Sequence, residues 1–135
     1  MKKILLSGLL AGLVMLVISV ALNFLWPVIF PSVTVEYQTP LFRPWSDPLM
    51  SLIFVCPILT GFFMAWVWNM FKNYHMFPIS KKVLTFSGSF VVMSIIGMIM
   101  TYSCFPISLL MLVTWCVSMV VQYFVGTWVL AKMNK

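Results

Sequence analysis

Four long apolar runs, separated by short polar segments, constrain this chain more than any other feature of its sequence. The runs occupy about residues 4–26, 48–71, 83–102 and 107–131. Each is long enough to cross a bilayer as an α-helix, which needs roughly 20 predominantly apolar residues. A helix also satisfies its backbone hydrogen bonds within one segment, as lipid requires. The sequence therefore predicts an all-α integral membrane protein, folded as an antiparallel four-helix bundle.

The composition agrees with a lipid environment. Of the 135 residues, 63% are hydrophobic and only 7% are charged, whereas soluble domains are about a quarter charged. So few polar groups cannot cover a water-facing surface. At this length we expect a single transmembrane domain, residues 1–135.

The N-terminal run admits a second interpretation, as a signal peptide. Two lysines precede an apolar stretch from Ile4 to Leu22, and the small residues around Ala21 would pass as a cleavage site. The stretch is longer than the apolar part of a usual signal peptide and matches a membrane span. We therefore expect it to form the first membrane helix.

Basic residues are distributed unevenly between the two sets of connections. With four spans, one side of the membrane would carry Arg43 beside both acidic residues, Glu36 and Asp47. The other side would carry Lys2, Lys3, Lys72, Lys81, Lys82, Lys132 and Lys135. Because basic connections stay on the cytoplasmic side, both termini are predicted to be cytoplasmic, with an exterior loop at residues 32–47. A cell (inner) membrane fits this asymmetry.

The same distribution bears on partners. A nucleic-acid-binding surface needs lysines and arginines clustered on one face, and here they occur in ones and twos at the ends of apolar runs. We therefore expect the lipid bilayer as a partner and no nucleic acid.

The longest polar interruption, Ser32 to Pro48, is the first candidate for a binding role. The candidate ligand- or partner-binding residues are Glu36, Tyr37, Arg43, Trp45 and Asp47. Arg43 and Trp45 suit the binding of a polar or aromatic ligand group, and Glu36 suits the role of hydrogen-bond acceptor or base.

These residues also have structural interpretations. Arg43 can pair with Glu36 or with a lipid phosphate, and the aromatic residues can anchor the loop at the interface. Asp47, directly before Pro48, has the signature of a helix N-cap. Both interpretations remain open at the level of sequence.

Polar residues within the runs are neutral. Thr114, Ser118 and Gln122 recur every fourth residue and predict a mildly polar stripe that faces protein rather than lipid. Carriers usually place an ionisable group within a span, and these runs contain none. Gly8 and Gly12 predict a close helix contact, favoured within the bundle but also possible between copies in a homo-oligomer.

Sulfur-containing residues and the single histidine give no metal or cofactor motif. Cys56, Cys104 and Cys116 form no CxxC pair, and a disulfide between Cys56 and Cys104 stays open. The twelve methionines suggest copper(I) binding, since copper(I) takes soft sulfur ligands. However, they form no dense motif in a water-facing segment, and methionine also suits apolar packing. His75 has no carboxylate or second ligand nearby in the sequence. We therefore expect no metal, no cofactor and no catalytic set.

The sequence thus predicts a multi-pass membrane protein that acts as a non-enzymatic accessory or interaction module and presents residues 32–48 outward. One alternative is an oligomeric small-solute carrier or channel lined by the polar stripe. Another is a membrane enzyme with an outer-face site at Glu36, Arg43 and Asp47, which requires these groups to converge within hydrogen-bond reach.

Overall fold

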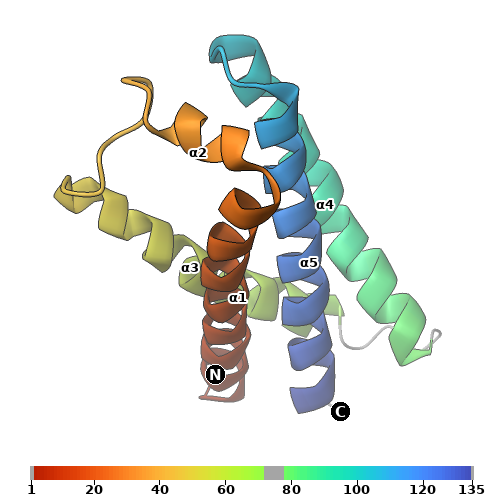
Figure 1. Ribbon diagram of the computed structural model, residues 1–135. Coiled ribbons are helices and arrows are strands. Elements are labelled where there is room, and N and C mark those ends of the chain that lie inside the picture. Colours follow the sequence, from red (N-terminus) through yellow and green to blue (C-terminus); the bar gives the residue numbers. More distant parts are fainter. Residues whose placement is uncertain (1, 72–77, 135) are drawn as a thin grey trace.

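The computed structural model describes residues 2–71 and 78–134, and this part of the chain is all-helical (Figure 1). Its α-helices are α1 (Lys2–Ile29), α2 (Pro31–Tyr37), α3 (Leu52–Phe71), α4 (Ile79–Cys104) and α5 (Leu109–Met133). A short 3-10 helix, η1 (Pro48–Ser51), leads into α3. Four segments, namely α1, η1 with α3, α4 and α5, are long and apolar enough to cross a membrane. The predicted all-α class is confirmed.

Several helix ends differ from the predicted bounds. α1 continues through Pro27, and the Phe30 N–H still donates to the Trp26 carbonyl oxygen (2.7 Å), so the missing proline N–H does not end the helix. α4 begins at Ile79, earlier than expected. Ser80 therefore lies inside the helix, and Pro78 takes the N-cap position.

The predicted exterior loop is wrong in its first part, which forms the helix α2. Pro31 occupies the first helical position, where its fixed φ favours a helix and its missing N–H costs nothing. Val33 is 1% exposed and packs with Ile107 and Met111 of the α5 region. Burial against α5 therefore stabilises a helix that the polar sequence around it does not reveal.

Among the long helices, α1 and α5 each pack mainly against two neighbours. α1 packs against α3 and α5, and α4 packs against α5. Figure 1 shows α3 crossing α1 obliquely instead of lying along it. α3 and α4 meet through aromatic side chains, with ring centroids 5.1 Å apart for Trp68 and Phe86 and 5.9 Å apart for Phe63 and Phe90.

Three glycines allow α1 and α3 to touch backbone to backbone. A Cβ atom at Gly61 would lie 2.5 Å from the Gly12 Cα and 2.6 Å from the Gly8 carbonyl oxygen. A Cβ atom at Gly12 would lie 2.7 Å from the Ile58 Cα. The close helix contact predicted for Gly8 and Gly12 is made within the chain, with α3.

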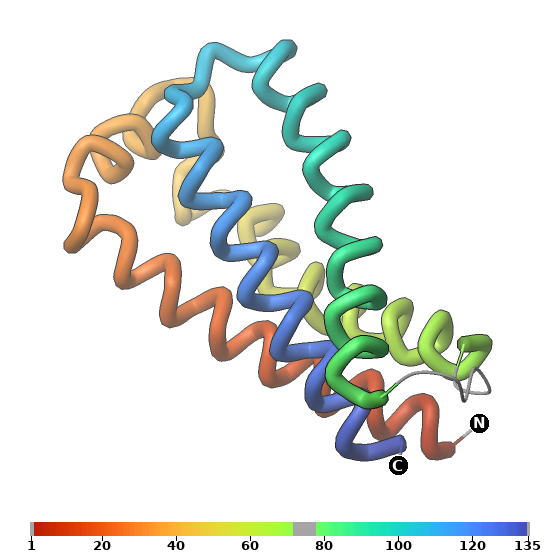
Figure 2. Tube along the Cα trace, turned by 90° about the vertical axis from the view of Figure 1, so that its right-hand side faces the viewer, coloured from red at the N-terminus to blue at the C-terminus, as the bar shows by residue number. Residues whose placement is uncertain are grey.

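Charged residues separate to the two ends of the molecule. The start of α1, the start of α4 and the end of α5 lie together, and the segment between α1 and α3 lies at the other end (Figures 1 and 2). We call the first the lysine end, defined by Lys2, Lys3, Lys81, Lys82 and Lys132. The second is the loop end, residues 31–48, and it holds both acidic residues. Lys72, His75 and Lys135 lie outside the described residues.

The glycine contact gives a test of the fold. Gly61→Ala should lower the free energy of unfolding by about 1–3 kcal/mol, because the added methyl group meets backbone atoms that cannot rotate away. Detergent-induced unfolding followed by circular dichroism measures this change.

Gly97→Ala in α4 is the matched control, because a Cβ atom there meets nothing within 4 Å. It should leave stability unchanged or raise it by about 0.5–1 kcal/mol, the gain for replacing a mid-helix glycine. Equal destabilisation by the two substitutions would contradict the contact.

Candidate functional site

At the loop end, Glu36 of α2 caps the N-terminus of α5. Its Oε1 accepts a hydrogen bond from the Ser108 N–H (2.5 Å), and its Oε2 accepts one from the Ser108 hydroxyl (2.6 Å). Ser108 is itself the N-cap of α5, and its Oγ accepts a hydrogen bond from the Met111 N–H (3.1 Å). A carboxylate at this position also interacts favourably with the positive end of the helix dipole.

An aromatic cluster continues this contact. The Trp115 indole N–H donates to the Tyr37 hydroxyl oxygen (2.6 Å). Phe42 packs on both rings, with centroids 5.2 Å from Tyr37 and 6.3 Å from Trp115. Burial raises the pKa of the Tyr37 phenol; the Trp115 hydrogen bond opposes this shift, and the charge of Glu36 adds to it. The phenol therefore stays neutral and accepts the indole N–H at neutral pH.

The predicted polar stripe of α5 lies partly in the same region. The Trp26 indole N–H of α1 donates to the Ser118 Oγ (2.7 Å). The Ser118 hydroxyl donates to the Thr114 carbonyl oxygen, and the Thr114 hydroxyl donates to the Met111 carbonyl oxygen (2.7 Å each). Gln122 is half-buried, and its amide makes no hydrogen bond to another described residue. Ser118 thus joins α5 to α1.

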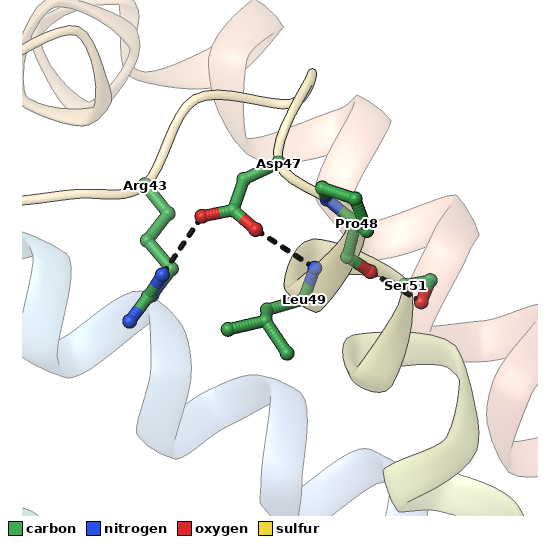
Figure 3. Close-up of polar contacts among 5 residues, drawn as sticks. All are labelled: Arg43, Asp47, Pro48, Leu49 and Ser51. Carbon is green, nitrogen blue, oxygen red and sulfur yellow. Dashed lines mark hydrogen bonds and ion pairs between the residues drawn. The ribbon is translucent and has the colours of Figure 1, made fainter.

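Arg43 and Asp47 form a second, more exposed group (Figure 3). The Arg43 Nη1 lies 2.7 Å from the Asp47 Oδ2, and the Asp47 Oδ1 accepts a hydrogen bond from the Leu49 N–H (2.9 Å). The Leu49 N–H and then the Arg43 guanidinium hold the pKa of the Asp47 carboxyl below its usual value. Asp47 is the N-cap of η1 with Pro48 at the first helical position, which confirms the predicted helix start.

The five predicted site residues therefore divide into two groups. Glu36 and Tyr37 bind α5, whereas Arg43 binds Asp47 and not Glu36, the protein partner considered from sequence. Trp45 is 70% exposed and makes no hydrogen bond or ring contact within the described part of the chain. Both carboxylates have both oxygens occupied, and no hydrogen bond between described residues joins the two groups.

Residues that sequence reasoning missed complete the site. Ser108, Trp115 and Trp26 each bond a side chain from a different helix. Ser108 carries a local signal, since it stands at a helix start, but nothing in the sequence links it to Glu36 across the intervening two helices.

The three cysteines are free thiols in the structure, so Cys56 and Cys104 do not pair. Among the described residues, no three histidine, cysteine or acidic side chains gather as they would to hold a metal ion.

Comparison with protein-family models, with curated proteins and with solved structures gave no match. The fold and composition define the class of the protein: across residues 2–71 and 78–134 it is all-helical, with four helices able to cross a membrane.

The contact between Glu36 and Ser108 can be measured by a double-mutant cycle. Glu36→Ala and Ser108→Ala should each destabilise the protein, and their effects should be non-additive by about 1 kcal/mol, because both remove the hydrogen bond between the Ser108 hydroxyl and the Glu36 carboxylate. The Ser108 N–H bond to Glu36 is lost only in Glu36→Ala. Unfolding in detergent gives the coupling energy. Glu36→Ala combined with Ser103→Ala is the control, since Ser103 bonds within its own helix to Ile99 and should act additively.

Asp47 gives a prediction for pH. Its lowered pKa in the fold means that its cap is fully present above the ordinary value of 3.8 and is lost as the pH falls through the lower, folded value. The Leu49 amide signal in NMR spectra should therefore titrate with a midpoint below 3.8. Arg43→Gln should raise this midpoint only in part, because the Leu49 hydrogen bond is the larger cause. A midpoint at the ordinary value would exclude the cap.

Proposed function

We propose that this chain is a multi-pass membrane protein with both termini in the cytoplasm, most simply of a cell (inner) membrane, and that it acts as a non-enzymatic interaction module. The segregation of charge supports this orientation, since the lysine end matches the side on which basic connections are retained. The loop end then faces the exterior and presents residues 32–48 to a partner.

One observation carries the interaction role: the loop end has an anchored half and a displayed half. Glu36 and Tyr37 tie α2 to α5. The segment that follows presents Trp45, 70% exposed, and the Arg43 side chain, 61% exposed. Tryptophan and arginine are the residues most enriched where binding energy concentrates at protein interfaces. A fixed base with an exposed tryptophan and arginine suits the capture of a second protein.

The geometry also indicates what such a partner offers. Asp47 binds one nitrogen of the Arg43 guanidinium and holds the guanidinium in place. The remaining N–H donors of Arg43 are available to a partner. A carboxylate beside an apolar or aromatic side chain on the partner would satisfy Arg43 and Trp45 together. The partner is therefore expected to present an acidic patch with an apolar edge on the exterior side.

The polar stripe favours packing over a transport pathway. Thr114 is buried, and the Thr114 and Ser118 hydroxyls donate to carbonyl oxygens of α5. Ser118 also accepts the Trp26 indole N–H, which ties α5 to α1. A pathway would require these hydroxyls to face an open channel between helices.

A photo-crosslinker beside the displayed residues tests the proposal. Ser46→Cys, in a background without the three native cysteines, would be modified in intact cells with a membrane-impermeant maleimide crosslinker. We expect the probe to react from outside and to capture a defined protein. Arg43→Gln or Trp45→Ala should reduce that product at least tenfold, the loss expected when an interface residue worth about 1.4 kcal/mol or more is removed.

Tyr102→Ala is the matched control, since this tyrosine is 45% exposed but lies in α4, outside the displayed segment. It should leave the crosslinked product unchanged. If the impermeant reagent fails to modify position 46 but modifies Ser80→Cys, the orientation is the reverse of the one proposed. A product that survives both Arg43→Gln and Trp45→Ala would overturn the interaction surface.

A further inference from the structure

At the lysine end, the first turn of α4 and the last turns of α5 border a groove that the function above does not use. Its volume is about 250 Å³, and its lining residues are Ile79, Ser80, Trp128, Ala131 and Lys132. The start of α4 and the end of α5, which supply its lining, lie at the opposite end of the molecule from residues 31–48 (Figures 1 and 2). It therefore needs an occupant different from the proposed partner of Arg43 and Trp45.

The groove has one cationic side. The Lys132 Nζ lies 5.6 Å from the centroid of the Trp128 ring, a cation–π distance that keeps the ammonium beside the groove. Lys132 has no carboxylate partner among the described residues, and both acidic residues of the sequence are at the loop end. Lys81 and Lys82 directly follow Ser80 in α4 and add positive charge at the same end of the molecule. A bound anion would therefore meet uncompensated charge.

The remaining lining is amphipathic. The Ser80 hydroxyl makes no hydrogen bond to any other residue in the described ranges, so it can donate to a ligand. Ile79, Ala131 and the half-exposed Trp128 ring supply apolar walls. Phe124, 42% exposed, stacks with Trp128 at 6.4 Å and extends this apolar surface along α5 away from the lysine end.

We propose that this groove binds an anionic phospholipid from the leaflet at the lysine end. The lipid phosphate would lie between the Lys132 ammonium and the Ser80 hydroxyl, and an acyl chain would follow Trp128 and Phe124. Basic pockets between membrane helices bind anionic headgroups in this way. The apolar surface continuous with the groove favours a phospholipid over free phosphate, and the net charge of +6 favours an anionic lipid over a zwitterionic one. The proposal holds whichever side of the membrane the lysine end faces.

Native mass spectrometry of the full chain in detergent tests this site. The protein would be mixed separately with phosphatidylglycerol and with phosphatidylcholine. We expect one phosphatidylglycerol to be retained preferentially, and Lys132→Gln to weaken its retention about fivefold, the effect of one lysine near a lipid phosphate. Lys3→Gln removes the same charge at the same end, but from α1 and outside the groove, and should retain the lipid like the native chain.

Further variants separate this site from its alternatives. Lys132→Arg should keep the lipid. Ser80→Ala should weaken lipid retention while circular dichroism shows unchanged helicity. This second variant keeps the test decisive if Lys132→Gln does not fold. Equal losses from Lys132→Gln and Lys3→Gln would overturn the site in favour of diffuse attraction. Equal retention of the two lipids, or displacement of phosphatidylglycerol by inorganic phosphate, would also overturn it.

Discussion

The backbone contact between α1 and α3 sets the geometry of the other elements. Gly8, Gly12 and Gly61 remove the side chains that would hold the two helices apart, so α3 crosses α1 at close range and obliquely. In lipid, helix association relies on such close packing because no hydrophobic force distinguishes helix surfaces from acyl chains. The oblique crossing carries the start of α3 away from α5 at the loop end (Figure 1). The chain between α1 and α3 must bridge this separation, which gives the long polar segment a geometric reason as well as a candidate binding role.

α5 connects the two ends of the molecule. Near its N-terminus, Ser108 and Trp115 form hydrogen bonds with side chains of α2, and Ser118 forms one with Trp26 of α1. Near its C-terminus, Trp128 and Lys132 border the groove with α4. α5 therefore anchors the segment that precedes Arg43 and Trp45 near its start, and it borders a cationic, partly apolar groove near its end.

The loop end shows where sequence reasoning succeeded and where it failed. Asp47 before Pro48 was readable as a helix start because a cap depends on neighbouring residues alone. α2 was missed because its stability comes from contacts distant in the chain: Val33 buried against α5 and Glu36 bonded to Ser108. The partner of Arg43 was also undetermined, since Glu36 and Asp47 are both near in sequence and only the fold turns Glu36 toward α5. Candidate residues could be named from composition, but their division into anchored and displayed groups could not.

The sequence by itself determined the class of structure, with four helices in the described part of the chain able to span a membrane, and the sorting of basic and acidic residues between alternate connections. These properties follow from the length and polarity of local segments, which the surrounding solvent selects without reference to the rest of the chain. The tertiary structure alone decided which helices touch, that Gly61 packs against Gly8 and Gly12, and that Ser80 and Lys132 line one groove. Those outcomes depend on the relative rotation and crossing of helices, because helix surfaces of similar apolar character can pack in several ways until close contacts select one.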